Sequence, residues 1–130
     1  MIAVDASALL EVLLRTPKGE RVEARLLSRG ESLHAPHLVD VEVAQVLRRY
    51  AAAGTISAGR GQEALSDLAD FPIVRYPHEP FLRRIWALRH NVTAYDAAYL
   101  ALAEALPAPL VTCDGWLASA PGHSARVETW

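Results

Sequence analysis

The sequence predicts an α/β domain. Apolar runs of strand length alternate with amphipathic stretches of helical length, a pattern typical of this class. Hydrophobic residues make up 52% of the chain and charged residues 22%, which excludes a disordered protein and is enough for a buried core. The 130 residues contain no repeat, low-complexity tract or linker, so residues 1–130 are predicted to form a single domain.

The first part of the chain predicts two strands and two helices. A short, bounded apolar run indicates a strand over residues 2–5. The apolar stretch after it predicts a helix over residues 7–15, ended by a Thr-Pro-Lys-Gly break whose proline suits the first turn of the next helix. That second helix is expected over residues 20–28, with Gly30 closing it. A second strand follows over residues 33–35 and ends at a proline.

The middle of the chain predicts three helices and a strand. An apolar stripe of valine, leucine and tyrosine at helical spacing indicates a helix over residues 37–53, which a glycine ends. A further helix is expected over residues 57–69, followed by a strand over residues 73–76. Apolar residues at helical spacing predict another helix over residues 79–90.

The last third predicts one buried helix and two strands. The helix over residues 93–106 carries only Asp96 and Glu104 as charges, with a stripe of tyrosine and leucine and many alanines, so we expect it to be buried. A strand is predicted over residues 110–112, and residues 127–130 are expected to form a short edge strand.

Four acidic residues stand where the chain changes from one element to the next. Asp5 ends the first strand, Glu42 lies early in the third helix, Asp96 in the first turn of the sixth helix, and Asp114 follows the fourth strand. Open parallel sheets bind ligands beyond the carboxyl ends of their strands, so these acids are placed to converge. Two carboxylates about 5 Å apart repel by about 3 kcal/mol at an effective dielectric constant of 20, which favours a bound cation. An all-oxygen cluster suits Mg²⁺ or Mn²⁺.

Each acid also has a structural interpretation. Asp5 is suited to cap the first helix, Thr93 and Asp96 match a capping box, and Asp114 before a glycine is a turn or cap signal. A capping acid can still face a metal ion. The buried character of the sixth helix nevertheless means that an ionised Asp96 needs a partner.

Glu42 is harder to place from the pattern alone. Asp40 and Glu42 lie about equally far from the apolar stripe of their helix, on opposite sides of it. Helical periodicity therefore leaves both open as the inward-facing acid.

Four segments in this order resemble the PIN-domain nucleases, and the short chain is similar to the VapC-type toxins of type II toxin–antitoxin pairs. The segments are Met-Ile-Ala-Val-Asp5-Ala-Ser7, Val-Glu42-Val-Ala-Gln-Val-Leu-Arg-Arg, Thr93-Ala-Tyr-Asp96-Ala-Ala-Tyr-Leu-Ala-Leu-Ala and Leu-Val-Thr112-Cys-Asp114. The resemblance implies a PIN-like three-layer fold, with a mostly parallel, short-stranded sheet and helices on both faces. It also implies Mg²⁺-dependent hydrolysis of RNA phosphodiester bonds, a small cognate antitoxin and a homodimer.

The resemblance assigns the site residue by residue. Asp5, Glu42, Asp96 and Asp114 match the acidic positions of the family motif, and this match selects Glu42 over Asp40. Asp5 and Asp96 are expected to be the metal ligands, with Glu42 and Asp114 completing the pocket. Ser7 and Thr112 are expected to supply hydroxyls that steady a carboxylate or a metal-bound water. One position departs from the pattern: Gln45 stands where many members carry asparagine.

Other function classes fit less well. A receiver-like phosphoacceptor domain also needs Mg²⁺ and acids at strand ends, but it requires a lysine after a late strand, and the only lysine is Lys18. The glycines form no nucleotide-binding loop. A catalytically inactive PIN-like binding domain stays open as an alternative.

The remaining composition bears on partners and location. A net charge of −2 argues against a simple basic surface for nucleic acid, although a nuclease can hold phosphate through a metal ion and a few arginines. The single cysteine, Cys113, excludes an internal disulfide. With no apolar run long enough to span a membrane and no basic leader, the expected location is cytoplasmic.

Overall fold

The computed structural model describes all 130 residues and contains a five-stranded sheet in which all neighbouring strands run parallel. The strand order is β3-β2-β1-β4-β5, which puts β1 in the centre and β5 at an edge. The α/β prediction is confirmed, and the last strand lies at the edge as expected. The strands are β1 (Ile2–Val4), β2 (Leu33–Pro36), β3 (Ile73–Tyr76), β4 (Leu110–Thr112) and β5 (Val127–Thr129).

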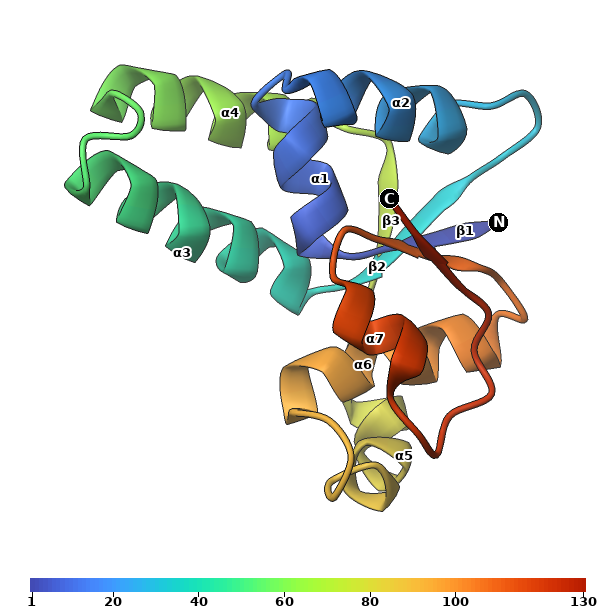
Figure 1. The fold of residues 1–130 in the computed structure, drawn as a ribbon. Helices are drawn as coiled ribbons and strands as arrows, with labels where there is room; N and C mark the ends of the chain where they lie inside the picture. The colour runs from blue at the N-terminus through green and yellow to red at the C-terminus, as the bar shows by residue number, and fades with distance from the viewer.

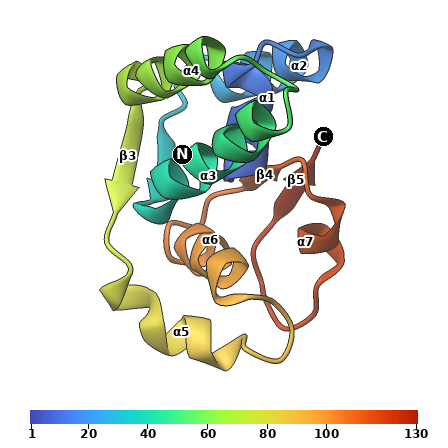
Figure 2. The same ribbon diagram turned by 90° about the vertical axis from the view of Figure 1, so that its left-hand side faces the viewer.

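Seven α-helices and one short 3₁₀ helix connect the strands. They are α1 (Ala6–Leu13), α2 (Pro17–Leu26), α3 (Leu38–Ala52), α4 (Ala58–Asp70), the 3₁₀ helix η1 (Glu79–Phe81), α5 (Leu82–Ala87), α6 (Ala94–Ala105) and α7 (Gly115–Ser119). Figure 1 shows α1, α2 and α4 on one side of the strands and α5, α6 and α7 on the other. In the turned view of Figure 2, α3 lies with α1 and α4, which it contacts. None of these helices has the length and apolar character needed to cross a membrane.

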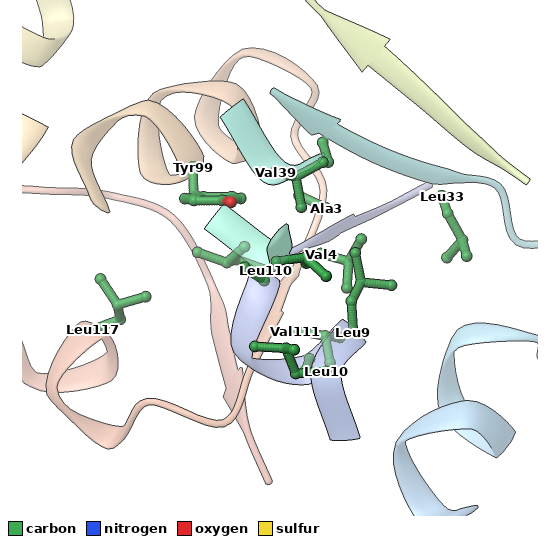
Figure 3. Packing of buried hydrophobic residues seen from close by; sticks show 14 of the residues in the cluster. Ala3, Val4, Leu9, Leu10, Leu33, Val39, Tyr99, Leu110, Val111 and Leu117 are labelled. Atoms are coloured by element: carbon green, nitrogen blue, oxygen red, sulfur yellow. The ribbon is translucent and has the colours of Figure 1, made fainter. Parts of the chain in front are cut away.

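The core lies between the central strands and the helices that cover them. All three residues of β1 are fully buried, because a central parallel strand is covered on both faces. Figure 3 shows Val4 of β1 and Val111 of β4 close to Leu9 of α1. Tyr99 of α6 belongs to the same buried cluster, with only 1% of its surface exposed. This packing holds the carboxyl ends of β1 and β4 in fixed positions.

The strand order reverses at β1. The chain moves from β1 outward through β2 to β3 and then returns to β4 on the other side of β1. Val4 is paired with Val111, so the carboxyl ends of β1 and β4 open side by side at one edge of the sheet. This reversal is the point at which open α/β sheets bind ligands. Asp5 directly follows β1, and Asp114 lies two residues beyond the end of β4.

The predicted helix over residues 79–90 is wrong in its extent. The structure has a 3₁₀ turn at its start, where Pro80 lies, and a separate short helix that ends at Ala87. Apolar spacing does not mark where the helix begins and ends, and two of the apolar residues on which it rests, Leu82 and Trp86, are 56% and 69% exposed. α5 packs mainly on α6, and its other face is open to solvent.

Three smaller differences also have physical reasons. The apolar stripes of the third and sixth predicted helices include Tyr50 and Tyr95, yet both side chains are exposed, at 36% and 65%. Both belong to hollows at the surface rather than to the core. The second helix begins earlier than residue 20, because Thr16 caps it. The short helix α7 was not expected, and Asp114 is its cap.

The contact between α1 and α2 passes through Gly19. A Cβ atom at this position would lie 2.1 Å from the backbone oxygen of Glu11 on α1. Only a residue without a side chain lets the two backbones approach this closely. Gly19 therefore fixes where the first turn of α2 lies against α1.

Replacing Gly19 with alanine is expected to lower the free energy of unfolding by about 1–3 kcal/mol, since the two helices must separate to admit the methyl group. The matched control is Gly59→Ala in α4, where a Cβ atom meets no heavy atom within 4 Å. That change is expected to leave stability unchanged or to raise it by up to about 1 kcal/mol. Urea unfolding of both variants checks the prediction, and equal destabilisation by the two changes would contradict it.

Candidate active site

The four acidic residues singled out in the sequence line one cleft of about 370 Å³ at the carboxyl ends of β1 and β4. Asp5 comes from the β1–α1 junction, Glu42 from the second turn of α3, Asp96 from the first turn of α6 and Asp114 from the β4–α7 junction. We call this hollow the acid cleft and define it by these four side chains. Residues up to 109 positions apart in the chain, from 5 to 114, thus share one site.

Asp5 lies deepest in the acid cleft and receives three hydrogen bonds. Its side chain is 7% exposed. The backbone N–H of Ser7 donates to Oδ1 at 3.2 Å, while the hydroxyls of Ser7 and Thr112 donate to Oδ2 at 3.0 and 2.5 Å. These contacts fix the orientation of the carboxylate without supplying a positive charge.

The two hydroxyls are themselves held by the turn after β4. The backbone N–H of Cys113 donates to Ser7 Oγ at 2.9 Å, and that of Asp114 donates to Thr112 Oγ1 at 2.9 Å. Each hydroxyl proton is therefore free to point at Asp5. Ser7 and Thr112 lie where the family resemblance predicts hydroxyls beside a carboxylate.

The acids also cap helices, as the sequence predicts. Asp5 caps α1, and Asp114 caps α7 by accepting from the N–H of Trp116 at 3.0 Å. Thr93 caps α6 by accepting from the N–H of Asp96 at 3.2 Å. Asp5 and Asp114 therefore cap helices and line the cleft as well, whereas only the Thr93 half of the predicted capping box is formed, since Asp96 does not accept from the N–H of Thr93.

The choice between Asp40 and Glu42 is decided by an ion pair. Asp40 forms a bidentate pair with Arg75 of β3, with N–O distances of 2.7 and 2.8 Å. Glu42 turns to the other side of α3 and lines the acid cleft. Its Oε1 atom is buried without a hydrogen-bond partner, and the hydroxyl of nearby Tyr99 is likewise unpartnered.

Burial and mutual repulsion disfavour the ionised acids. Burial raises the pKa of Glu42 from 4.5 to about 7; the Tyr99 hydroxyl lowers it in part, and Asp5 and Asp96 add to the rise. Burial also raises the pKa of Asp5, against the hydrogen bonds from Thr112 and Ser7. The pKa of Asp96 is raised by burial and then by Asp5 and Asp114. None of the four acids forms an ion pair that would offset this cost.

The donor set fits a divalent cation that keeps part of its water. All four acids offer oxygen, and the buried Oε1 atom of Glu42 makes no hydrogen bond to the protein, although the Tyr99 hydroxyl lies nearby. No three His, Cys, Asp or Glu side chains are arranged to hold an ion by themselves. An ion of the Mg²⁺ type commonly takes one or two carboxylates and keeps several waters, which suits this cleft. Asp5 and Asp96, whose charges repel each other, are two carboxylates that could bind such an ion.

Three further residues lie near the acids. Lys18 of α2 lines the acid cleft, although its position between the first two helices gave no sign of this. Arg49 of α3 lines it as well. Gln45 lines an adjoining groove with Glu42 instead of the cleft itself.

Comparison with known proteins agrees with this architecture. The model of the PIN domain family matches residues 2–122.

This chain belongs to the PIN domain family.

The PIN chain is 44% identical over 128 residues to ribonuclease VapC12 of Mycobacterium tuberculosis (strain ATCC 25618 / H37Rv), covering 98% of each protein. Its fold is similar to the crystal structure of VapBC2 from Rickettsia felis bound to a DNA fragment from their promoter, with a TM-score of 0.72 and 16% identity over 100% of this chain and 99% of that one. It is also similar to VapC20 of M. tuberculosis, described as a sarcin-ricin loop cleaving toxin, with a TM-score of 0.70 and 14% identity over 95% and 97% of the two chains.

The raised pKa of Glu42 predicts how stability depends on pH without metal. The folded PIN domain keeps a proton on Glu42 that the unfolded chain releases above its ordinary pKa of 4.5, so stability falls as pH rises towards about 7. Asp5 and Asp96 act in the same direction.

Glu42→Gln is therefore expected to flatten this slope in thermal unfolding with EDTA between about pH 5 and pH 8. Glu20→Gln on the exposed face of α2 is the control and should keep the wild-type slope. An unchanged slope in Glu42→Gln would show that Glu42 does not carry the effect.

Proposed function

We propose that this PIN domain is a Mg²⁺-dependent endoribonuclease, with Mn²⁺ as an alternative ion. The observation that carries the proposal is the convergence of Asp5, Glu42, Asp96 and Asp114 in one cleft at the reversal point of the sheet. The 44% identity to a relative named a ribonuclease supports RNA as the substrate. A divalent ion would supply a water of lowered pKa and positive charge for the reacting phosphate.

The residues of the acid cleft have different roles in the proposed reaction. Asp5 and Asp96 hold the cation through carboxylate oxygens. Ser7 and Thr112 keep the Asp5 carboxylate in one orientation by donating to its Oδ2 atom. Glu42 completes the pocket with Asp114, and its unpartnered Oε1 atom is available to accept a proton or hydrogen bond from the attacking water.

We further propose that the protein acts as the toxin of a toxin–antitoxin pair and is inhibited by a small cognate antitoxin. The similarity to VapC20, described as a toxin, and to the VapBC2 complex supports this role. A cation from the partner directed at the acid cleft would offset its uncompensated negative charge. Because cellular RNA is the proposed substrate, the proposed location is cytoplasmic.

A homodimer is part of the same proposal. Leu82 and Trp86 leave large apolar surfaces on α5 open to solvent, at 56% and 69% exposure. Lying four residues apart on one helix face, they offer an apolar surface that a second copy of the chain would cover.

Asp96→Asn is expected to abolish cleavage of RNA in Mg²⁺, because one of the two proposed metal ligands loses its charge. The fold should remain, and the metal-free melting temperature should stay the same or rise, since repulsion with Asp5 is relieved. Asp70→Asn, an exposed change at the end of α4, is the matched control and should cleave at the wild-type rate. A gel assay with and without EDTA measures this. Wild-type activity in Asp96→Asn, or cleavage that EDTA leaves intact, would refute the metal-ligand assignment.

Expression of the chain alone is expected to arrest growth of the host, whereas the Asp96→Asn variant should accumulate without harm. Co-expression of the product of an adjacent short reading frame should restore growth to cells with the wild-type protein. Growth curves with parallel immunoblots measure this. Normal growth with abundant wild-type protein and no partner would contradict the toxin role.

A further inference from the structure

The acid cleft is lined by two basic residues as well as by acids. Lys18 and Arg49 both belong to its wall. Neither makes an ion pair, in contrast to the arginines whose charges are taken up by acids elsewhere: Arg25, Arg60, Arg75, Arg84 and Arg126. Two uncommitted positive charges therefore border the acids without neutralising any carboxylate directly.

The position of Lys18 is set by the start of α2. Thr16 caps the helix by accepting from the N–H of Gly19 at 2.9 Å, and Pro17 occupies the first turn. The close approach of Gly19 to α1 then fixes this turn beside the cleft. The positive charge of Lys18 acts on Cys113, the residue that follows β4. Burial raises the pKa of the Cys113 thiol, and Lys18 lowers it in part.

Helix electrostatics alone would not select this lysine. The first turn of a helix carries partial positive charge, which favours acids and disfavours cations. The only lysine of the chain stands in such a turn. A cation in the first turn of a helix goes against this local preference, and such exceptions are expected at functional sites.

Arg49 borders the cleft from α3, on the same face as Glu42. Glu42, Val46 and Arg49 follow one another at spacings of four and three residues, and all three line the cleft. At 1.5 Å per residue, Arg49 lies about 10 Å along the helix from Glu42. Arg48 and Arg49 are both exposed, but only Arg49 lines the cleft.

We propose that Lys18 and Arg49 are positioning residues that bind backbone phosphates of the RNA next to the scissile bond, one from α2 and the other from α3. The inference rests on the proposed ribonuclease function. A polyanion entering a cleft of four acids is repelled at its neighbouring phosphates, and these two cations are placed to offset that repulsion. Lys18 acts as a point charge, and Arg49 offers paired N–H donors to phosphate oxygens.

The test is the salt dependence of RNA binding, measured by fluorescence anisotropy with a labelled single-stranded RNA of mixed sequence in EDTA, where no cleavage occurs. Each phosphate contact to a single strand contributes about 0.7 to the slope of log K against log salt concentration. Lys18→Gln and Arg49→Gln are each expected to reduce the slope by about 0.7 and to weaken binding about five-fold at 0.1 M salt. Lys18→Arg should restore the slope.

The matched controls are Arg21→Gln on α2 and Arg48→Gln on α3, which remove exposed cations that do not line the cleft. Both are expected to keep the wild-type slope. In Mg²⁺, the KM for RNA should rise about five-fold in Lys18→Gln and in Arg49→Gln, with a smaller change in kcat.

An unchanged slope in Lys18→Gln and Arg49→Gln, or an equal drop in the controls, would overturn the inference while leaving the ribonuclease proposal intact. A second outcome is that the wild-type protein cleaves no RNA, while Lys18→Gln and Arg49→Gln still reduce the slope of log K against log salt concentration. That outcome would overturn the ribonuclease function and leave the inferred phosphate contacts standing. If Lys18→Gln does not fold, the slopes of Arg49→Gln and Lys18→Arg are compared with those of the same two controls, and this comparison decides the outcome.

Discussion

The structure depends on carboxylates that are brought together although none of them forms an ion pair. Asp5 is buried at the reversal point of the sheet, and Glu42 and Asp96 approach it from two different helices. Burial and repulsion raise the pKa of all three, so the ionised cluster is costly until a cation enters.

At this site the same side chains stabilise the local backbone and line the cleft. Asp5 and Asp114 cap α1 and α7, so the residues that face the cleft also satisfy backbone N–H groups at helix starts. The turn after β4 donates to Ser7 and Thr112, and those hydroxyls in turn orient Asp5. Rigid strands and helix starts therefore hold the carboxylates in place, as pre-organisation of a reactive site requires.

The sequence predicts those parts of the fold and the site that follow from local rules. Asp5 and Asp114 could be placed at one edge of the sheet because they follow apolar runs of strand length. Glu42 could not be separated from Asp40 by periodicity, since the pairing of Asp40 with Arg75 of β3 is a tertiary contact.

The place of Lys18 in the cleft could not be predicted from the sequence for a similar reason, because it depends on the close packing of α2 on α1. The error at α5 concerns its extent: apolar spacing continues through the 3₁₀ turn at Glu79–Phe81 and past Ala87, and it does not show where a helix begins and ends.

Anomalous diffraction from crystals grown with Mn²⁺ tests the central claim most directly. The account predicts a manganese peak in the cleft, with Asp5 and Asp96 as its protein ligands, and loss of that peak in Asp5→Asn crystals. Occupied manganese sites elsewhere on the protein, with none in the cleft, would contradict it.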